Sequence, residues 1–214
     1  MRFDEAASRL SAWPTVLPPP GDIFMPVVTD DRDLNLRRRP DIGEGRPAAV
    51  LVLVYPDEAG DARLVLIERP TYDGHHSGEV SFPGGKAEPD DPDLIATALR
   101  EAAEEVGLRP DDAGVTVVGR LDDHWIPVSD FRITPIVALA ERRPDLVAQP
   151  AEVVRILEPP VIRFLPGPEV AVIERTIDTW PLRYGHYEID GLSVWGATAR
   201  ILSQLGAVLG SDAT

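Results

Sequence analysis

The chain contains no cysteine, which excludes a disulfide framework, a zinc–thiolate site and a cysteine nucleophile. It also lacks an apolar run long enough to cross a bilayer. Residues 1–25 do not follow the order of a signal peptide, in which positive charge precedes an apolar core and a small-residue cleavage site. From these absences we expect a soluble protein of the cytoplasm.

Positive charge is scarce in this sequence. The 21 lysines and arginines are outnumbered by 36 aspartates and glutamates, so the formal net charge is −15. This balance argues against nucleic acid as a partner and against docking on anionic membranes. The densest positive run is Arg37-Arg38-Arg39, which we interpret either as a solvated patch or as a contact for an anionic ligand.

The length of 214 residues suits one globular domain with an extension. We assign residues 1–45 to an N-terminal helix and a proline-rich arm, and residues 46–210 to the main domain. Phe3–Trp13 has the periodicity of a short amphipathic helix, which Pro14 and the prolines at 18–20 end. The arm suits a spacer or packing segment, and a homodimer is compatible with it although nothing in the sequence requires one.

Strand and helix patterns are mixed along the main domain, which predicts an α/β fold. Ala48–Tyr55 is a continuous aliphatic run typical of a buried strand, and Arg63–Glu68 is expected to run antiparallel to it. Residues 122–130 are expected to form a loop. Further strands are predicted at Val115–Leu121, Phe131–Ala140 with Pro135 at an edge or bulge, Val170–Ile177 and Tyr184–Ile189, and a helix at Leu192–Leu205.

The stretch from Ser81 to Leu108 organises the rest of the chain. It opens with Gly84-Gly85, where the backbone can take positive φ or approach a ligand closely. Asp90, Asp91 and Pro92 have the chemistry of a helix start, and Gly107 that of a left-handed helix cap. The apolar residues that recur at helical spacing are expected to be buried; they are Leu94, Ile95, Ala98, Leu99 and Ala102.

Three glutamates lie near the end of this predicted helix. Glu101, Glu104 and Glu105 are spaced i, i+3 and i+4, so they share one helix face and repel one another. They also lie toward the negative end of the helix dipole. A solvated acidic face is one interpretation. We favour a metal site, because oxygen ligands suit Mg²⁺ or Mn²⁺ and the cation relieves the repulsion, with Arg100 bracing the cluster.

Residues 85–108 resemble the Nudix box, whose pattern is G-x5-E-x7-R-E-U-x-E-E-x-G-U, with U a bulky apolar residue. Two departures occur in its first half. Asp91 stands where the pattern has Glu, and eight residues instead of seven separate it from Arg100. The extra residue falls at the loop-to-helix junction, where it is easily absorbed. The matching positions are Arg100-Glu101, Glu104-Glu105, Gly107 and Leu108, with the small Ala102 at the first U.

Segments on both sides of the box are similar to those of coenzyme A pyrophosphatases. Upstream, L-I-E-R and F-P-G-G fall in register, although Pro70 and Gly74 depart from the pattern. Gly74 replaces a usual arginine, for which His75 or His76 is a candidate substitute; either is equally a plain loop residue. Downstream, the 126–137 segment and the W-G-A-T-A-R-I-L run at 195–202 also resemble that branch.

The resemblance implies a Nudix fold, in which a mixed β-sheet is sandwiched between α-helices (α/β/α). It also implies roles for particular residues. Glu101, Glu104 and Glu105 are expected to hold Mg²⁺ or Mn²⁺, and Glu101, Glu104, Arg100 and Glu152 to act in catalysis, with Glu104 or Glu152 as the base. The expected substrate-binding residues are Arg69, His76, Phe82, Gly84, Gly85 and Phe131. Trp125 and Phe131 are candidates for stacking on an adenine or pantetheine, although isolated aromatic residues are more often core residues.

The expected activity is hydrolysis of the diphosphate bond of coenzyme A or its acyl derivatives, giving 3′,5′-ADP and (acyl-)4′-phosphopantetheine. One alternative is the same chemistry on another nucleoside diphosphate derivative, such as ADP-ribose, NADH or a dinucleotide. A second alternative is a non-catalytic Nudix-fold ligand sensor. The intact Arg100-Glu101 and Glu104-Glu105 pairs argue against a sensor, which does not need them.

Overall fold

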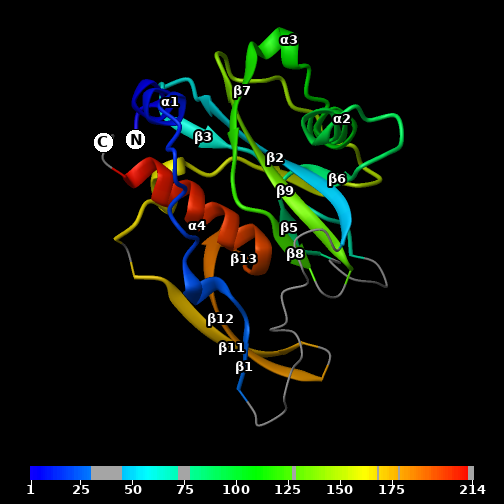
Figure 1. Cartoon of the computed structure of the whole chain (residues 1–214), viewed down its shortest axis with the longest axis vertical. Coiled ribbons are helices and arrows are strands. Elements are labelled where there is room, and N and C mark those ends of the chain that lie inside the picture. The colour runs from blue at the N-terminus through cyan, green and yellow to red at the C-terminus, as the bar shows by residue number, and fades with distance from the viewer. Residues whose placement is uncertain (30–44, 72–77, 127–128, 168, 178, 212–214) are drawn as a thin grey trace.

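The computed structural model describes residues 1–29, 45–71, 78–126, 129–167, 169–177 and 179–211 (Figure 1). The helices are α1 (Phe3–Ser11), η1 (Asp22–Phe24), α2 (Leu94–Val106), α3 (Pro110–Ala113), η3 (Val161–Phe164) and α4 (Gly196–Gly210). The strands are β1 (Val27–Val28), β2 (Arg46–Pro56), β3 (Ala62–Leu64), β4 (Leu66–Glu68), β5 (Val80–Ser81), β6 (Gly84–Lys86), β7 (Val115–Arg120), β8 (His124–Ile126), β9 (Phe131–Ala140), β10 (Arg155–Leu157), β11 (Ala171–Ile177), β12 (Trp180–Ile189) and β13 (Leu192–Val194). None of the described helices is long and apolar enough to cross a membrane.

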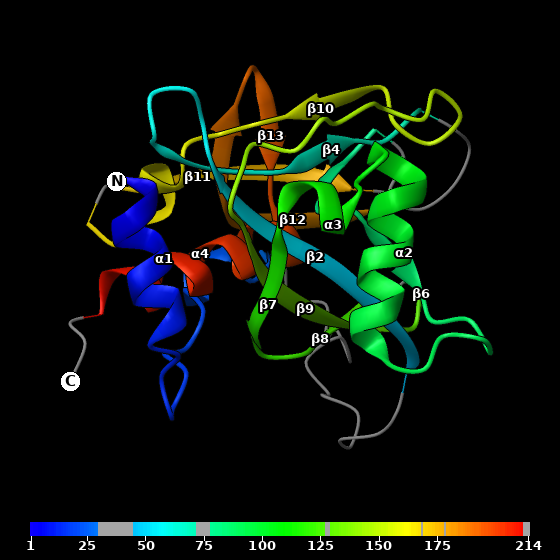
Figure 2. The ribbon, with the colours of Figure 1, turned by 90° about the horizontal axis from the view of Figure 1, so that it is seen from above.

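The largest sheet has the order β3-β2-β9-β7, with β6 also paired to β2 and β8 to β9. Strands β2 and β9 are parallel and the other pairs are antiparallel, so the sheet is mixed. Its faces are set by the two-residue period of β2. Val50, Val52 and Val54 belong to one buried cluster with residues of α1 and α4, whereas Leu51 and Leu53 belong to another with residues of α2. The sheet therefore lies between helices, as expected (Figure 2).

Two smaller sheets flank this one, with the orders β10-β4-β5 and β1-β12-β11. The prediction of a single strand over Arg63–Glu68 was therefore wrong in one respect. Ala62–Leu64 pairs antiparallel with β2, but Leu66–Glu68 pairs with β5 and β10 instead. The chain changes sheets at Val65, and the apolar pattern gives no sign of this because every residue from Leu64 to Ile67 is buried.

Helix α2 begins later than the acidic run suggested. Its N-cap is Asp93, whose side chain accepts a hydrogen bond from Ala96 N at 2.8 Å, and not Asp90 or Asp91. Gly107 ends the helix in the left-handed conformation with φ 65°, as predicted. Ala98 and Ala102 are fully buried as expected, but Ile95 is 38% exposed, so its predicted burial was wrong.

Two further boundaries differ from the predictions. Leu192–Val194 forms a strand paired with β12, and the last helix begins only at Gly196, whose φ is +61°. The predicted loop at 122–130 contains strand β8. Pro135 lies in a central strand, yet its missing N–H costs little. Pro135 lies opposite the gap between β7, which pairs with β9 as far as Ile136, and β8, which pairs from Ile133. Its carbonyl accepts a hydrogen bond from Leu121 N in this gap, where no strand requires the N–H that proline lacks.

The N-terminal segment packs on the main sheet. Ala6 and Leu10 of α1 are fully buried in the cluster that contains α4. The Trp13 indole lies against Gly119 of β7, 2.3 Å from where a Cβ would be. The domain boundary at residue 45 stays a prediction, and Arg37–Arg39 lie outside the described residues.

Candidate metal and active site

The three glutamates of α2 differ in depth. The side chain of Glu105 is 2% exposed, that of Glu101 is 13% exposed and that of Glu104 is 54% exposed. The i, i+3, i+4 spacing therefore forms a row of carboxylates that runs from the interior toward solvent. Burial of an ionised carboxylate is unfavourable unless it has partners, so the contacts of each one matter.

Glu105 is held by two other segments. Its Oε2 accepts a hydrogen bond from Gly84 N at 2.8 Å, and its Oε1 lies 3.2 Å from Arg69 Nη2. Burial raises the pKa of Glu105 to about 7, against the opposing effects of Arg69 and Gly84 and with the support of the charges on Glu101 and Glu152.

Glu101 lies directly over Gly85. A Cβ at Gly85 would lie 2.5 Å from the Glu101 carboxyl carbon, so only glycine leaves room for this carboxylate. The neighbouring Gly84 has φ 153°, and a Cβ there would lie 2.3 Å from the Ala49 carbonyl. Burial raises the pKa of Glu101, and the charges of Glu104 and Glu152 raise it further, against the lowering effect of Arg100. The predicted Gly84-Gly85 turn is thus the short strand β6, pressed between β2 and the glutamates.

Arg100 contacts the two more exposed glutamates of the row and one aspartate before the helix. Its Nη1 lies 3.0 Å from Glu101 Oε1 and 3.1 Å from Glu104 Oε2, and its Nη2 donates to the Lys86 carbonyl. Nε and Nη2 also meet the two oxygens of Asp91, each at 3.0 Å. The Asp91 hydrogen bond is the main cause of the raised pKa of Arg100. Arg100 thus braces the cluster as predicted, and despite the extra residue Asp91 is its partner.

Glu152 reaches the same region from a distant part of the chain. In the loop before it, Val147 N donates a hydrogen bond to the Val106 carbonyl at the end of α2. Gln149 N donates one to the Glu105 carbonyl. After it, Val154 N donates to the Glu68 carbonyl of β4. These bonds place Glu152 where its charge raises the pKa values of both Glu101 and Glu105. The expected role of Glu152 as the base stays a prediction.

The predicted substrate-binding residues are only partly brought together. Arg69, Gly84 and Gly85 lie at the carboxylates, whereas Phe82 is 1% exposed in the core and presents no surface to a ligand. Phe131 begins β9, and the Arg46 guanidinium lies over its ring at 4.1 Å. Phe131 pairs with Arg46 of β2, and Gly85 pairs with Ala49 of the same strand. Arg46 and Ala49 are three residues apart, so Phe131 lies roughly 10 Å along the strand from Gly85. His76 lies outside the described residues.

One contact at the site was not foreseen. Ser81 Oγ accepts a hydrogen bond from Arg69 Nε at 3.1 Å. The only signal in the sequence was a small polar residue directly before the F-P-G-G run.

The donor set at this site fits a hard divalent cation. Glu101, Glu104, Glu105 and Glu152 supply only carboxylate oxygens, and burial of like charges is relieved by such an ion. Among the residues that the structure describes, no three acidic or histidine side chains are grouped tightly enough to coordinate one ion as they stand. Arg100 contacts Glu101 and Glu104 instead, and Arg69 contacts Glu105.

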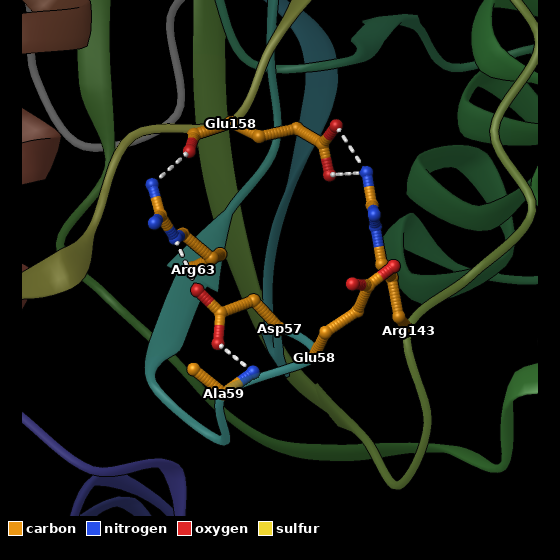
Figure 3. Close-up of a pocket in the computed structure, with 6 residues that line it drawn as sticks. All are labelled: Asp57, Glu58, Ala59, Arg63, Arg143 and Glu158. Carbon is orange, nitrogen blue, oxygen red and sulfur yellow. Dashed lines mark hydrogen bonds and ion pairs between the residues drawn. The ribbon is translucent and has the colours of Figure 1, made fainter.

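Two pockets lie elsewhere. One has a volume of about 390 Å³ and is lined by Asp57, Glu58, Ala59, Arg63, Arg143 and Glu158 (Figure 3). Four of its charged side chains are paired, since Arg143 contacts Glu158 at 2.9 Å and Arg63 contacts Asp57 at 2.9 Å. The other, of about 580 Å³, lies between η1, η3, β12 and α4. Neither is lined by any of the predicted catalytic residues.

Comparisons with known proteins identify the relatives of this chain. The family model of the NUDIX domain matches residues 45–179. The chain is 34% identical over 179 residues to Nudix hydrolase 15, mitochondrial, of Arabidopsis thaliana, covering 81% of this chain and 62% of that protein. It is 35% identical over 178 residues to the uncharacterized Nudix hydrolase NudL of Enterobacter sp. (strain 638), covering 79% and 86%. The solved Nudix hydrolase RenU of M. smegmatis is 22% identical, with a TM-score of 0.46 over 55% of this chain and 72% of that one.

Proposed function

Because this chain belongs to the Nudix family, we propose that it is a metal-dependent hydrolase of the diphosphate bond in coenzyme A or its acyl derivatives. The products are 3′,5′-ADP and (acyl-)4′-phosphopantetheine. The observation that carries the hydrolase proposal is the row of three glutamates on α2, which Arg69 and Arg100 contact at 3.0–3.2 Å. The charge of Glu152 also acts on Glu101 and Glu105. The choice of coenzyme A is supported by the sequence on both sides of the box, L-I-E-R with F-P-G-G before it and W-G-A-T-A-R-I-L after it.

In this proposal Glu101, Glu104 and Glu105 hold Mg²⁺ or Mn²⁺. The bound ion supplies positive charge that offsets the anionic diphosphate oxygens and helps to orient the bridge. Arg100 keeps the outer glutamates close to one another. Glu104 or Glu152 accepts the proton of the attacking water. The charges of both residues act on Glu101.

Substrate contacts are proposed for the Gly84-Gly85 backbone, for Phe131 and, outside the described residues, for His76. The guanidinium of Arg46 over Phe131 adds positive charge beside an aromatic face, which suits a nucleotide. A cytoplasmic location and a homodimer remain expectations from the sequence.

A substrate panel tests this function. The protein is incubated with Mn²⁺ and coenzyme A, ADP-ribose or NADH, and the products are identified by mass spectrometry. We expect 3′,5′-ADP and 4′-phosphopantetheine from coenzyme A at the highest kcat/KM, with release from the Glu104→Gln variant slower by roughly a hundredfold. Turnover of ADP-ribose or NADH without coenzyme A cleavage would identify the alternative substrate class. Ligand binding without metal-dependent product release would identify a sensor.

A further inference from the structure

Arg69 lies just beyond the end of β4, at the junction of three segments of the site. Its Nη2 donates to the Gly84 carbonyl at 3.1 Å and to Glu105 Oε1 at 3.2 Å, and its Nε donates to Ser81 Oγ at 3.1 Å. The side chain is 27% exposed, so most of its surface faces protein. The guanidinium is therefore engaged by groups of β5, β6 and α2.

These contacts close a ring around the deepest glutamate. Glu105 Oε1 meets Arg69 and Glu105 Oε2 meets Gly84 N, while the carbonyl of the same glycine also accepts from Arg69. Both carboxylate oxygens thus have fixed partners, and both partners are linked through one guanidinium. A rotation of Glu105 would break the Arg69 contact and the Gly84 contact together.

We propose that Arg69, seated on Ser81, is a positioning residue that sets the orientation of the Glu105 carboxylate and does not contact substrate. This inference rests on the proposed function, in which Glu105 is a metal ligand. It replaces the substrate-binding role that the sequence suggested for Arg69, and it adds Ser81 to the site. Lysine cannot take the same role, because its single ammonium lacks the rigid fork that reaches three acceptors in different directions.

The test measures Mn²⁺ binding by electron paramagnetic resonance without substrate, and kcat and KM with coenzyme A. We expect Arg69→Lys to weaken Mn²⁺ binding by about 10–100-fold and to lower kcat, with KM changed by less than about twofold. Ser81→Ala keeps the Arg69–Glu105 contact and is expected to shift both quantities in the same direction by less. The matched control is Arg155→Lys, because Arg155 on β10 pairs with Glu68 at 2.9 Å and makes no ion pair with the glutamates of α2.

The outcomes separate this inference from the proposed function. An increase in KM for Arg69→Lys, with Mn²⁺ binding and kcat intact, would show that Arg69 contacts substrate and would overturn the inference alone. Unchanged values in both Arg69→Lys and Ser81→Ala would also overturn it. A wild-type protein that neither binds Mn²⁺ nor hydrolyses a diphosphate would refute the function itself. If Arg69→Lys does not fold, Ser81→Ala decides the matter by the same two measurements.

Discussion

Asp91 meets Arg100 through both carboxylate oxygens, each 3.0 Å from a different guanidinium nitrogen. Asp91 Oδ2 also accepts from Glu88 N and Thr97 Oγ1, each at 2.9 Å. One aspartate therefore ties the loop before α2 to the helix and to the arginine that gathers the outer glutamates. Bidentate pairs of this kind fix orientation as well as charge.

The first prediction concerns the pH dependence of this contact. The Arg100 hydrogen bond, with help from Glu88 and Thr97, holds the pKa of Asp91 well below its usual range. A lowered pKa in the folded state stabilises the fold above the unfolded pKa of about 3.9, and the benefit is lost as pH falls through the folded value. Asp91→Asn should therefore lower the unfolding temperature at pH 7. The difference from wild type should shrink below about pH 4, and an equal difference at every pH would contradict this account.

The second prediction concerns Glu104. Because its side chain is 54% exposed, Glu104→Gln should leave the unfolding temperature nearly unchanged. The same variant should lower kcat by roughly a hundredfold, about 2.7 kcal/mol of transition-state stabilisation. The control is Glu174→Gln, a 70% exposed glutamate on β11. Equal turnover by the two variants would show that Glu104 has no catalytic role.

The third prediction separates the two candidate bases. The acidic limb of the kcat–pH profile reports protonation of the base in the enzyme–substrate complex. Replacing the base with Gln should remove that limb, whereas replacing a group that only binds metal should lower kcat without removing it. Profiles of Glu104→Gln and Glu152→Gln, recorded at saturating Mn²⁺, make the assignment. A limb that persists in both variants would exclude both residues as the base.

The fourth prediction contrasts two adjacent glycines. Gly84→Ala places a methyl group against the Ala49 carbonyl at φ 153°, so it should destabilise the fold by roughly 1–3 kcal/mol. Gly85→Ala places its methyl group against the flexible end of Glu101, so the fold should survive while Mn²⁺ binding and kcat fall. Thermal unfolding and metal titration distinguish the two effects. Equal losses of stability in both variants would count against the close approach of Glu101.

The sequence predicts which glutamates share a helix face better than it predicts where the helices and strands begin and end. Glu101, Glu104 and Glu105 share a face simply because of helical spacing, and Gly107 ends the helix because a left-handed residue is needed there. The N-cap was mispredicted because Asp90, Asp91 and Asp93 are chemically equivalent candidates. In the folded structure the carboxylate of Asp91 is bound instead by Arg100, Glu88 N and Thr97 Oγ1.

The remaining errors also have tertiary causes. Leu192–Val194 carries a helix-compatible apolar pattern but pairs with β12, and the left-handed Gly196 delays the helix. Phe82 was expected at the ligand from the family resemblance, yet its ring packs in the core between β5 and β6. The approach of Glu152 depends on backbone bonds between the 147–154 loop, α2 and β4, which no local pattern encodes.

Those backbone bonds have a consequence for heat inactivation. The loop that carries Glu152 is hydrogen-bonded to the last carbonyls of α2 before this residue and to β4 after it, so it is attached on both sides of Glu152. Warming should thus leave the spacing among the acidic groups intact until the surrounding sheets separate. Turnover and tertiary structure would then vanish in a single cooperative step, without a folded but inactive species before it.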